Sequence, residues 1–381
     1  MLSEFWALGP IIKLDFPAPP RSLQVLHWPA GYHPKQSRVI FHETVHFWQY
    51  LASGYLARLV EEDWDRLVKF EDSGRVIWNT PLRSHFIEPH SVHAFSPRDL
   101  VEAFARYWDV HVVGPPQLIE LELQSAGHSF SCDFVERFER MKRENLASHP
   151  QHGAYSSASF DLAMEGPGGG WAKPYVMMLE RLTPKAVATL FPICINLALQ
   201  TANPVGTFTF LISGAPSIEN ALPSNNDIAI LWRWGYDFML PLLQELPRQD
   251  LLGNGIQVAS EGSLTGHPVW KWLIGYTLRA AAHFGITDGD KRNWETAVQN
   301  GLGPLSFALA CPGALSNRSK LVPFLSPPLV QFADGVAWSL AKDAAISVQT
   351  SSRGLTVLDE IAEVAQDIDD RWQSLLDTRG Y

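Results

Sequence analysis

The 381-residue sequence is poor in cysteine and in basic residues. Its three cysteines, Cys132, Cys194 and Cys311, are odd in number and far apart, which excludes a disulfide framework and a CxxC metal knuckle. The 30 Lys and Arg residues are outnumbered by 40 Asp and Glu residues, and the net charge is −10. Because no basic run occurs anywhere, we expect neither nucleic acid nor an anionic membrane surface as the main partner.

Long hydrophobic runs are also missing. The most apolar window, residues 187–199, is interrupted by Pro192 and Asn196 and is too short to cross a bilayer. Residues 1–20 lack the basic start, the sustained apolar stretch and the small-residue cleavage site of a secretory signal. We therefore expect a soluble, cytoplasmic protein with no membrane partner, whose oligomeric state the sequence does not indicate.

Several catalytic signatures do not occur. The chain has no GxSxG nucleophile elbow, no GxxxxGK[ST] phosphate loop and no GxGxxG dinucleotide fingerprint. The segment Asp288-Gly289-Asp290 looks like the start of an EF-hand loop, but the Gly and Glu that such a loop requires later are missing. A helix cap is the expected role of that segment.

The most informative segment that is present is His42-Glu43-Thr44-Val45-His46, within a run over residues 39–55 that is typical of a helix. Two histidines four residues apart lie one above the other on a helix face, and a glutamate directly after the first places its carboxylate at the rim of that face. With 13 histidines in the chain, about 0.02 copies of this pattern are expected by chance. The spacing indicates a metal-binding pair with an attached base.

The surrounding residues favour a helix with one buried face. Apolar residues recur at spacings of three and four beside the histidine stripe, so the histidines are expected at the edge of the buried face, where they can line a cleft. The alternative is an interfacial pair whose nitrogens are satisfied by neighbouring carbonyls. The apolar residues are Phe41, Val45, Trp48, Ala52, Tyr55 and Leu59.

Over residues 37–60, and weakly over residues 96–111, the chain resembles the HExxH zincins. In that family the two histidines bind the metal and the glutamate polarises a metal-bound water, which implies these roles for His42, His46 and Glu43. The metzincin subgroup is excluded, because its HExxHxxGxxH extension requires glycine where Gln49 stands and histidine where Ala52 stands. The resemblance is therefore to the glutamate-ligand type.

A zinc ion held by two histidines needs at least one further protein ligand. In the glutamate-ligand type this is a Glu on a second helix, commonly followed by a small residue, and Glu102 in the segment EAFA is similar to that pattern. The alternative is that Glu102 forms a surface ion pair with Arg106 at i+4. Glu165, just before the Gly-rich run at 166–170, is the second candidate ligand. Residues with a weaker signal as ligands or supporting partners are His85, Glu88, His90, His93, Glu261 and His267.

The sequence periodicity predicts a mainly α protein with a few short strands, a zincin-like active-site helix and a large helical C-terminal part. We expect one domain over residues 1–381, with a possible subdivision into a metal-binding part, 1–150, and a helical part, 171–381, joined by a Gly-rich loop at 151–170. The predicted helices cover residues 37–70 with a kink near Gly54, 96–111, 171–200 cut by Pro174, Pro184 and Pro192, 226–246, 269–284, 290–300, 329–345 and 355–378. The predicted extended segments are 23–28 and 74–82.

The second of these helices has the clearest start signal. Ser96 is a favoured N-cap residue, Pro97 suits the first helical position, and Asp99 stands three residues after the cap. A helix that begins at residue 97 would carry Glu102 on its second turn.

These residues predict a zinc metallohydrolase of narrow specificity that acts on a peptide or small-molecule amide. Zinc lowers the pKa of its bound water towards about 7, and Glu43 would accept the proton and pass it to the leaving amine. One alternative is a non-haem Fe(II) oxygenase or hydroxylase, such as a 2-oxoglutarate-dependent tailoring enzyme, with His42, His46 and Glu102 as its facial triad. Another is a metal-binding protein without a catalytic role.

Overall fold

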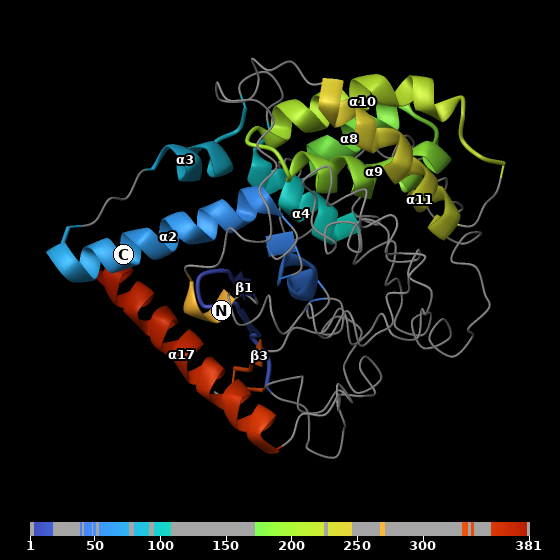
Figure 1. Cartoon of the computed structure of the whole chain (residues 1–381). Helices are drawn as coiled ribbons and strands as arrows, with labels where there is room; N and C mark the ends of the chain where they lie inside the picture. Colours follow the sequence, from blue (N-terminus) through green and yellow to red (C-terminus); the bar gives the residue numbers. More distant parts are fainter. Residues whose placement is uncertain are drawn as a thin grey trace.

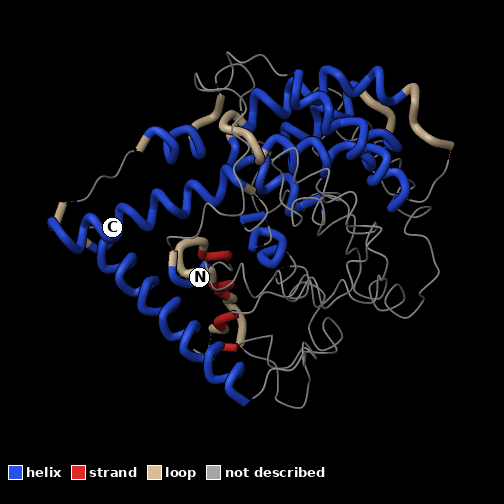
Figure 2. The backbone as a smooth tube through the Cα atoms, viewed as in Figure 1, coloured by secondary structure: helices blue, strands red, loops and turns tan. Residues whose placement is uncertain are grey.

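The fold is mainly α, as predicted, with one small sheet (Figures 1 and 2). Among the residues that the structure describes, no helix is both long enough and apolar enough to cross a membrane. The predicted helix at 290–300 and the predicted extended segment at 23–28 lie outside the described residues. The computed structural model describes residues 4–17, 39, 42–47, 49–50, 53–75, 80–90, 95–107, 172–224, 228–245, 267–270, 330–333, 337–338 and 352–378.

The long helix predicted over residues 37–70 is divided at Ser53. Residues 42–47 and 49–50 are helical and form what we call the motif helix, and α2 then spans Gly54–Ser73. Ser53 has an extended backbone, and its hydroxyl accepts a hydrogen bond from the Leu56 N–H and donates one to the Leu199 carbonyl. The kink predicted near Gly54 is therefore a boundary between two helices, with Ser53 as the N-cap of the second.

Two shorter helices follow α2. Helix α3 spans Pro81–Ile87 after the cap residue Thr80, so the prediction of extended structure up to residue 82 is wrong at its end. Helix α4 spans Pro97–Tyr107 and begins where the sequence predicts. The Ser96 N–H and hydroxyl both donate to Asp99 Oδ2, at 2.7 and 2.9 Å, and the Asp99 N–H donates to the Ser96 hydroxyl oxygen at 3.3 Å. This reciprocal capping fixes the first turn of α4.

The helices described between residues 172 and 245 form a packed layer against α4. Helix α9 packs on both α10 and α11, and α4 packs on α8, α9 and α10 (Figure 1). Pro192 and Pro174 lie inside helices and do not end them, whereas Pro184 begins one after its cap Thr183. The elements are α8 Ala172–Arg181, α9 Pro184–Ala198, α10 Pro204–Glu219, α11 Ile228–Met239 and the 3-10 helix η4 Leu240–Glu245.

The sheet joins segments from opposite ends of the sequence. Its strands lie in the order β1-β2-β3-β4, antiparallel except for the parallel pair β2 and β3, in which Ile12 is opposite Val330. The helix predicted over 329–345 is therefore wrong at 330–331 and at 337–338, because these residues form strands β3 and β4 of the sheet. The strands are β1 Glu4–Trp6, β2 Ile11–Lys13, β3 Val330–Gln331 and β4 Ala337–Trp338.

The C-terminal helix α17, Ser352–Asp377, confirms the helix predicted at 355–378 and packs against α2 (Figure 1). Arg371 forms a two-point ion pair with Glu71 near the ends of the two helices. A second ion pair joins Lys13 on β2 to the buried Asp369. Helix α17 therefore holds the sheet and α2 together.

Candidate metal centre

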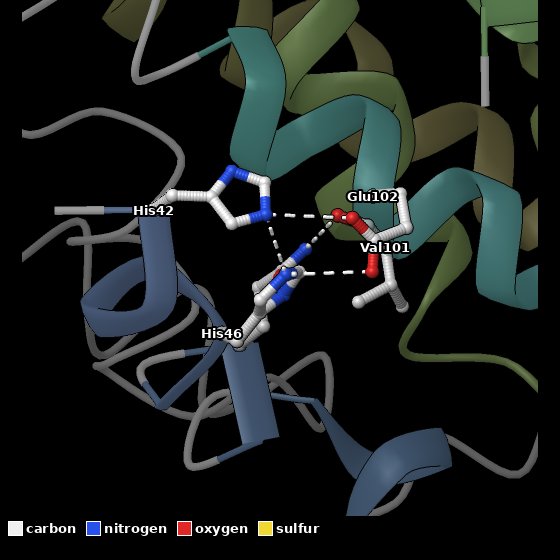
Figure 3. Close-up of polar contacts among 5 residues, drawn as sticks. His42, His46, Val101 and Glu102 are labelled. Carbon is white, nitrogen blue, oxygen red and sulfur yellow. Dashed lines mark hydrogen bonds and ion pairs between the residues drawn. The ribbon is translucent and has the colours of Figure 1, made fainter. Parts of the chain in front are cut away.

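Three side chains from two helices converge on one point (Figure 3). The Nε2 atoms of His42 and His46 are 3.0 Å apart, and they lie 3.4 and 3.6 Å from the two carboxylate oxygens of Glu102. Ligand atoms at the usual zinc bond lengths in a tetrahedral site are separated by about 3.3 Å. The three residues are therefore close enough to hold one metal ion, and the structure brings together the group that the sequence predicts.

Local packing sets the direction of each of these side chains. The two imidazole rings are nearly perpendicular, at 89°, with centroids 4.6 Å apart, as expected for neighbours at i and i+4. Val45 and Phe47, the neighbours of His46 in the sequence, are buried in the core. On α4, buried apolar residues flank Glu102 along the helix and leave its carboxylate facing the histidines.

The site is closed on the histidine side and more open on the glutamate side. The side chains of His42 and His46 are each 8% exposed, whereas that of Glu102 is 28% exposed. Of the three side chains, that of Glu102 is therefore the one most in contact with solvent.

The electrostatics favour an ionised Glu102. Burial by itself raises the pKa of this carboxyl, but the positive charges that His46 and His42 carry when protonated outweigh burial and hold the pKa well below its usual range. Glu102 is thus a carboxylate at neutral pH, which is the form that binds a metal.

Glu43 lies beside this group without belonging to it. It is buried, and burial raises its pKa; Glu102 adds to the rise, while His42, His46 and a hydrogen bond from the Phe5 backbone oppose it. The net result is a raised pKa. A carboxyl group with a raised pKa close to three side chains that could hold a metal ion is suited to accept and return a proton.

Gln49 is a further residue of the site, which the sequence pattern alone does not single out as a partner of the histidines. Its side chain is buried, its Oε1 lies 2.9 Å from Nδ1 of His46, and its Nε2 donates to the Val101 carbonyl at 3.1 Å (Figure 3). One signal could have pointed to it: positions 42, 46 and 49 follow the i, i+4, i+7 spacing of one helix face.

Aromatic packing holds the motif helix against the sheet. Trp270 stacks on Phe47 and Tyr50, with centroids 5.9 and 6.5 Å apart, and its indole N–H donates to the Ala7 carbonyl at 2.8 Å. Phe5 of β1 meets Phe47 edge-on at 6.0 Å. These contacts fix the helix relative to β1, whose backbone contacts Glu43.

The other predicted candidates are not brought into the group, or they lie outside the described residues. His85 is hydrogen-bonded to the Tyr55 hydroxyl at 2.9 Å, and His267 accepts a hydrogen bond from the Trp270 N–H. Glu88 and His90, after α3, are also not part of the group. The candidates outside the described residues are His93, Glu165 and Glu261, and their roles stay predictions.

Comparison of the chain with protein-family models, with curated protein sequences and with solved structures finds no match. The function therefore has to be inferred from the chemistry of this centre. Two imidazoles and one carboxylate suit both Zn²⁺ and Fe²⁺.

Proposed function

We propose that the protein is a zinc-dependent hydrolase of peptide or small-molecule amide bonds, with His42, His46 and Glu102 as the metal ligands. The observation that carries this proposal is the position of Glu43, buried beside the three ligands and separate from them. When bound, the ion supplies a Lewis acid and brings the pKa of a coordinated water towards about 7.

The residues of the chain then divide the remaining tasks. Glu43 accepts the proton of the attacking water on its carboxylate and returns it to the leaving amine. The hydrogen bond from the Phe5 backbone lowers the pKa of Glu43 and so favours its ionised, proton-accepting form. Glu102 stays ionised and offsets part of the charge of the ion.

The substrate is expected to be narrowly defined. The side chains of both histidines are almost fully buried, and that of Glu102 is more exposed. In this proposal the scissile bond of the substrate reaches the metal past Glu102, at one edge of α4. A short or extended peptide, or a small amide, fits that restriction better than a folded protein does.

The second candidate function is an Fe(II) oxygenase that uses the same three ligands. Two histidines and one carboxylate with open positions form the facial triad of such enzymes. That chemistry requires no buried carboxylate beside the ligands, and Glu43 would have no task in it. The presence of Glu43 is the reason that hydrolysis is preferred.

The proposal is tested on protein purified without added metal. We expect about one zinc ion per chain, lost in the His42→Ala/His46→Ala double variant and retained in the control His85→Ala, whose histidine is hydrogen-bonded to Tyr55. Glu43→Gln should keep the zinc and the fold but lower the rate of hydrolysis of a peptide or amide library by about 10²-fold or more.

Two results would contradict the hydrolase. Iron in the purified protein together with oxygen consumption would favour the oxygenase while leaving the three ligands in place. Loss of metal in Glu43→Gln would make Glu43 a ligand and leave the reaction without its base.

A further inference from the structure

Gln49 forms a fixed link between the two helices that supply the metal ligands. Its carboxamide is 1% exposed and is hydrogen-bonded at both ends, to His46 on its own helix and to the Val101 carbonyl on α4. Val101 directly precedes Glu102. The Gln49 side chain therefore contacts both His46 and the backbone carbonyl of the residue before Glu102.

The chemistry of the three groups sets the direction of every hydrogen bond in this link. A backbone carbonyl can only accept, so the NH₂ group of Gln49 must face Val101. The amide oxygen then faces Nδ1 of His46, and because that oxygen can only accept, Nδ1 must carry the proton. In neutral His46 this leaves Nε2 without a proton and with its lone pair directed towards His42 and Glu102.

The same link also restrains α4 at the turn that carries Glu102. Movement of α4 along the motif helix would stretch the 3.1 Å hydrogen bond between Gln49 Nε2 and the Val101 carbonyl. Gln49 therefore restrains both the imidazole and the carboxylate.

We propose that Gln49 is a positioning residue of the metal centre: it holds His46 in the tautomer that binds a metal through Nε2 and it holds Glu102 within reach. This inference rests on the proposed function for the identity of the bound group, but the tautomer of His46 does not depend on it. Partners that orient a metal-binding histidine change metal affinity by about 10 to 100-fold when they are replaced.

The test compares zinc affinity in three variants of the full chain. Gln49→Met keeps the volume and removes both hydrogen bonds, and we expect zinc affinity to fall by about 10 to 100-fold. Gln49→Glu still accepts the proton of His46 but cannot donate to Val101, so we expect it to recover most of the affinity while the protein is less stable than the native chain.

The matched control is Gln200→Met. Gln200 is equally buried, and its side chain accepts a hydrogen bond from the Gly54 N–H and donates one to the Asn196 carbonyl, so these two hydrogen bonds join backbone groups and not the proposed metal ligands. Its replacement should lower stability to a similar extent and leave zinc affinity within about twofold. A purely structural role for Gln49 would make the two Met variants alike in both measurements.

A spectroscopic measurement on the metal-free protein completes the test. At about pH 8.5, where histidine is neutral, the imidazole ¹⁵N resonances of native His46 should show a protonated Nδ1 and an unprotonated Nε2. In Gln49→Met the ring should populate both tautomers. A native His46 protonated at Nε2, or zinc binding by Gln49→Met as tight as in the native chain, would overturn the inference.

The two proposals fail in different ways. If the native chain binds neither zinc nor iron, the proposed function is wrong, and the His46 resonances still decide whether Gln49 orients that ring. If zinc binds and Gln49→Met has no effect on affinity or tautomer, the proposed function stands and the inference about Gln49 is wrong.

Discussion

Nε2 of His46 lies 3.6 Å from a carboxylate oxygen of Glu102, although the two residues belong to helices separated by α2 and α3 in the sequence. This contact is what turns a histidine pair on one helix into a centre with three ligand atoms. The contact depends on α4, because that helix carries Glu102.

Replacement of Glu102 should weaken metal binding without unfolding the protein. Glu102→Gln keeps the shape of the side chain but removes the charge, and we expect zinc affinity to fall by about 10²-fold, because a neutral amide is a poor zinc ligand. The control is Glu360→Gln, an exposed carboxylate on α17. Unchanged affinity in a zinc titration would remove Glu102 from the ligand set and make Glu165 the residue to test next.

Loss of the α4 cap should affect both stability and the metal site. Ser96→Ala removes the hydroxyl that bonds with Asp99 at the start of α4, and we expect a loss of about 1 kcal/mol in the free energy of unfolding. Zinc affinity should fall as well, because the same helix carries Glu102. The control Ser213→Ala removes an exposed hydroxyl that bonds only to its own helix, and it should change neither quantity appreciably. Equal behaviour of the two variants in urea unfolding would contradict this role of the cap.

Stability should decrease in mild acid because of His267. Burial lowers the pKa of His267 to about 4, and its Nδ1 accepts a hydrogen bond from the Trp270 N–H. The unfolded chain binds the proton at a higher pH than the folded chain, so this contribution to stability is complete above about pH 6.5 and is lost as the pH falls towards about 4.

Between about pH 7.5 and about pH 4.5 this loss should amount to about 2 to 3 kcal/mol. His267→Gln, which cannot take up the proton, should show a correspondingly smaller dependence of its urea midpoint on pH. A variant with the same pH dependence as the native chain would show that His267 does not cause the acid sensitivity.

The ion pairs at Asp63 should be unequal in strength. Asp63 accepts from Arg66 at 2.6 Å and from Arg83 at 2.8 Å, and the Arg66 side chain is 5% exposed while that of Arg83 is 39% exposed. Asp63→Ala removes a carboxylate from a buried guanidinium and should cost about 3 kcal/mol. Arg83→Ala removes the exposed partner and should cost about 1 kcal/mol or less. Similar losses in the two variants would contradict this difference.

The parts of the site that follow from local geometry could be predicted from the sequence. The pairing of His42 with His46 needs only helical spacing, and the start of α4 follows from the side chains of Ser96 and Asp99. Glu102 was predicted from a short pattern, and the structure places it beside both histidines. The identity of the ion and the role of Glu43 stay predictions.

The elements that were missed depend on packing between distant segments. Helix α10 is apolar on most of its surface because it is buried among neighbouring helices, and its Phe and β-branched residues show no clear helical period. Strands β3 and β4 have two residues each, and their pairing depends on β2 at the other end of the chain. The role of Gln49 depends on Val101, a partner that no local pattern indicates.

The parallel pairing of β2 with β3 also sets an order of events during synthesis. His42, His46 and Glu102 are all present once the ribosome has passed residue 102, and the helices α8, α9 and α10 that pack on α4 follow later. The Phe5 backbone that is hydrogen-bonded to Glu43 belongs to a sheet that needs residues 330–331 before it has its third strand. The three residues proposed to bind a metal are therefore made early, whereas the sheet that contains Phe5 gains its third strand only when most of the protein has been made.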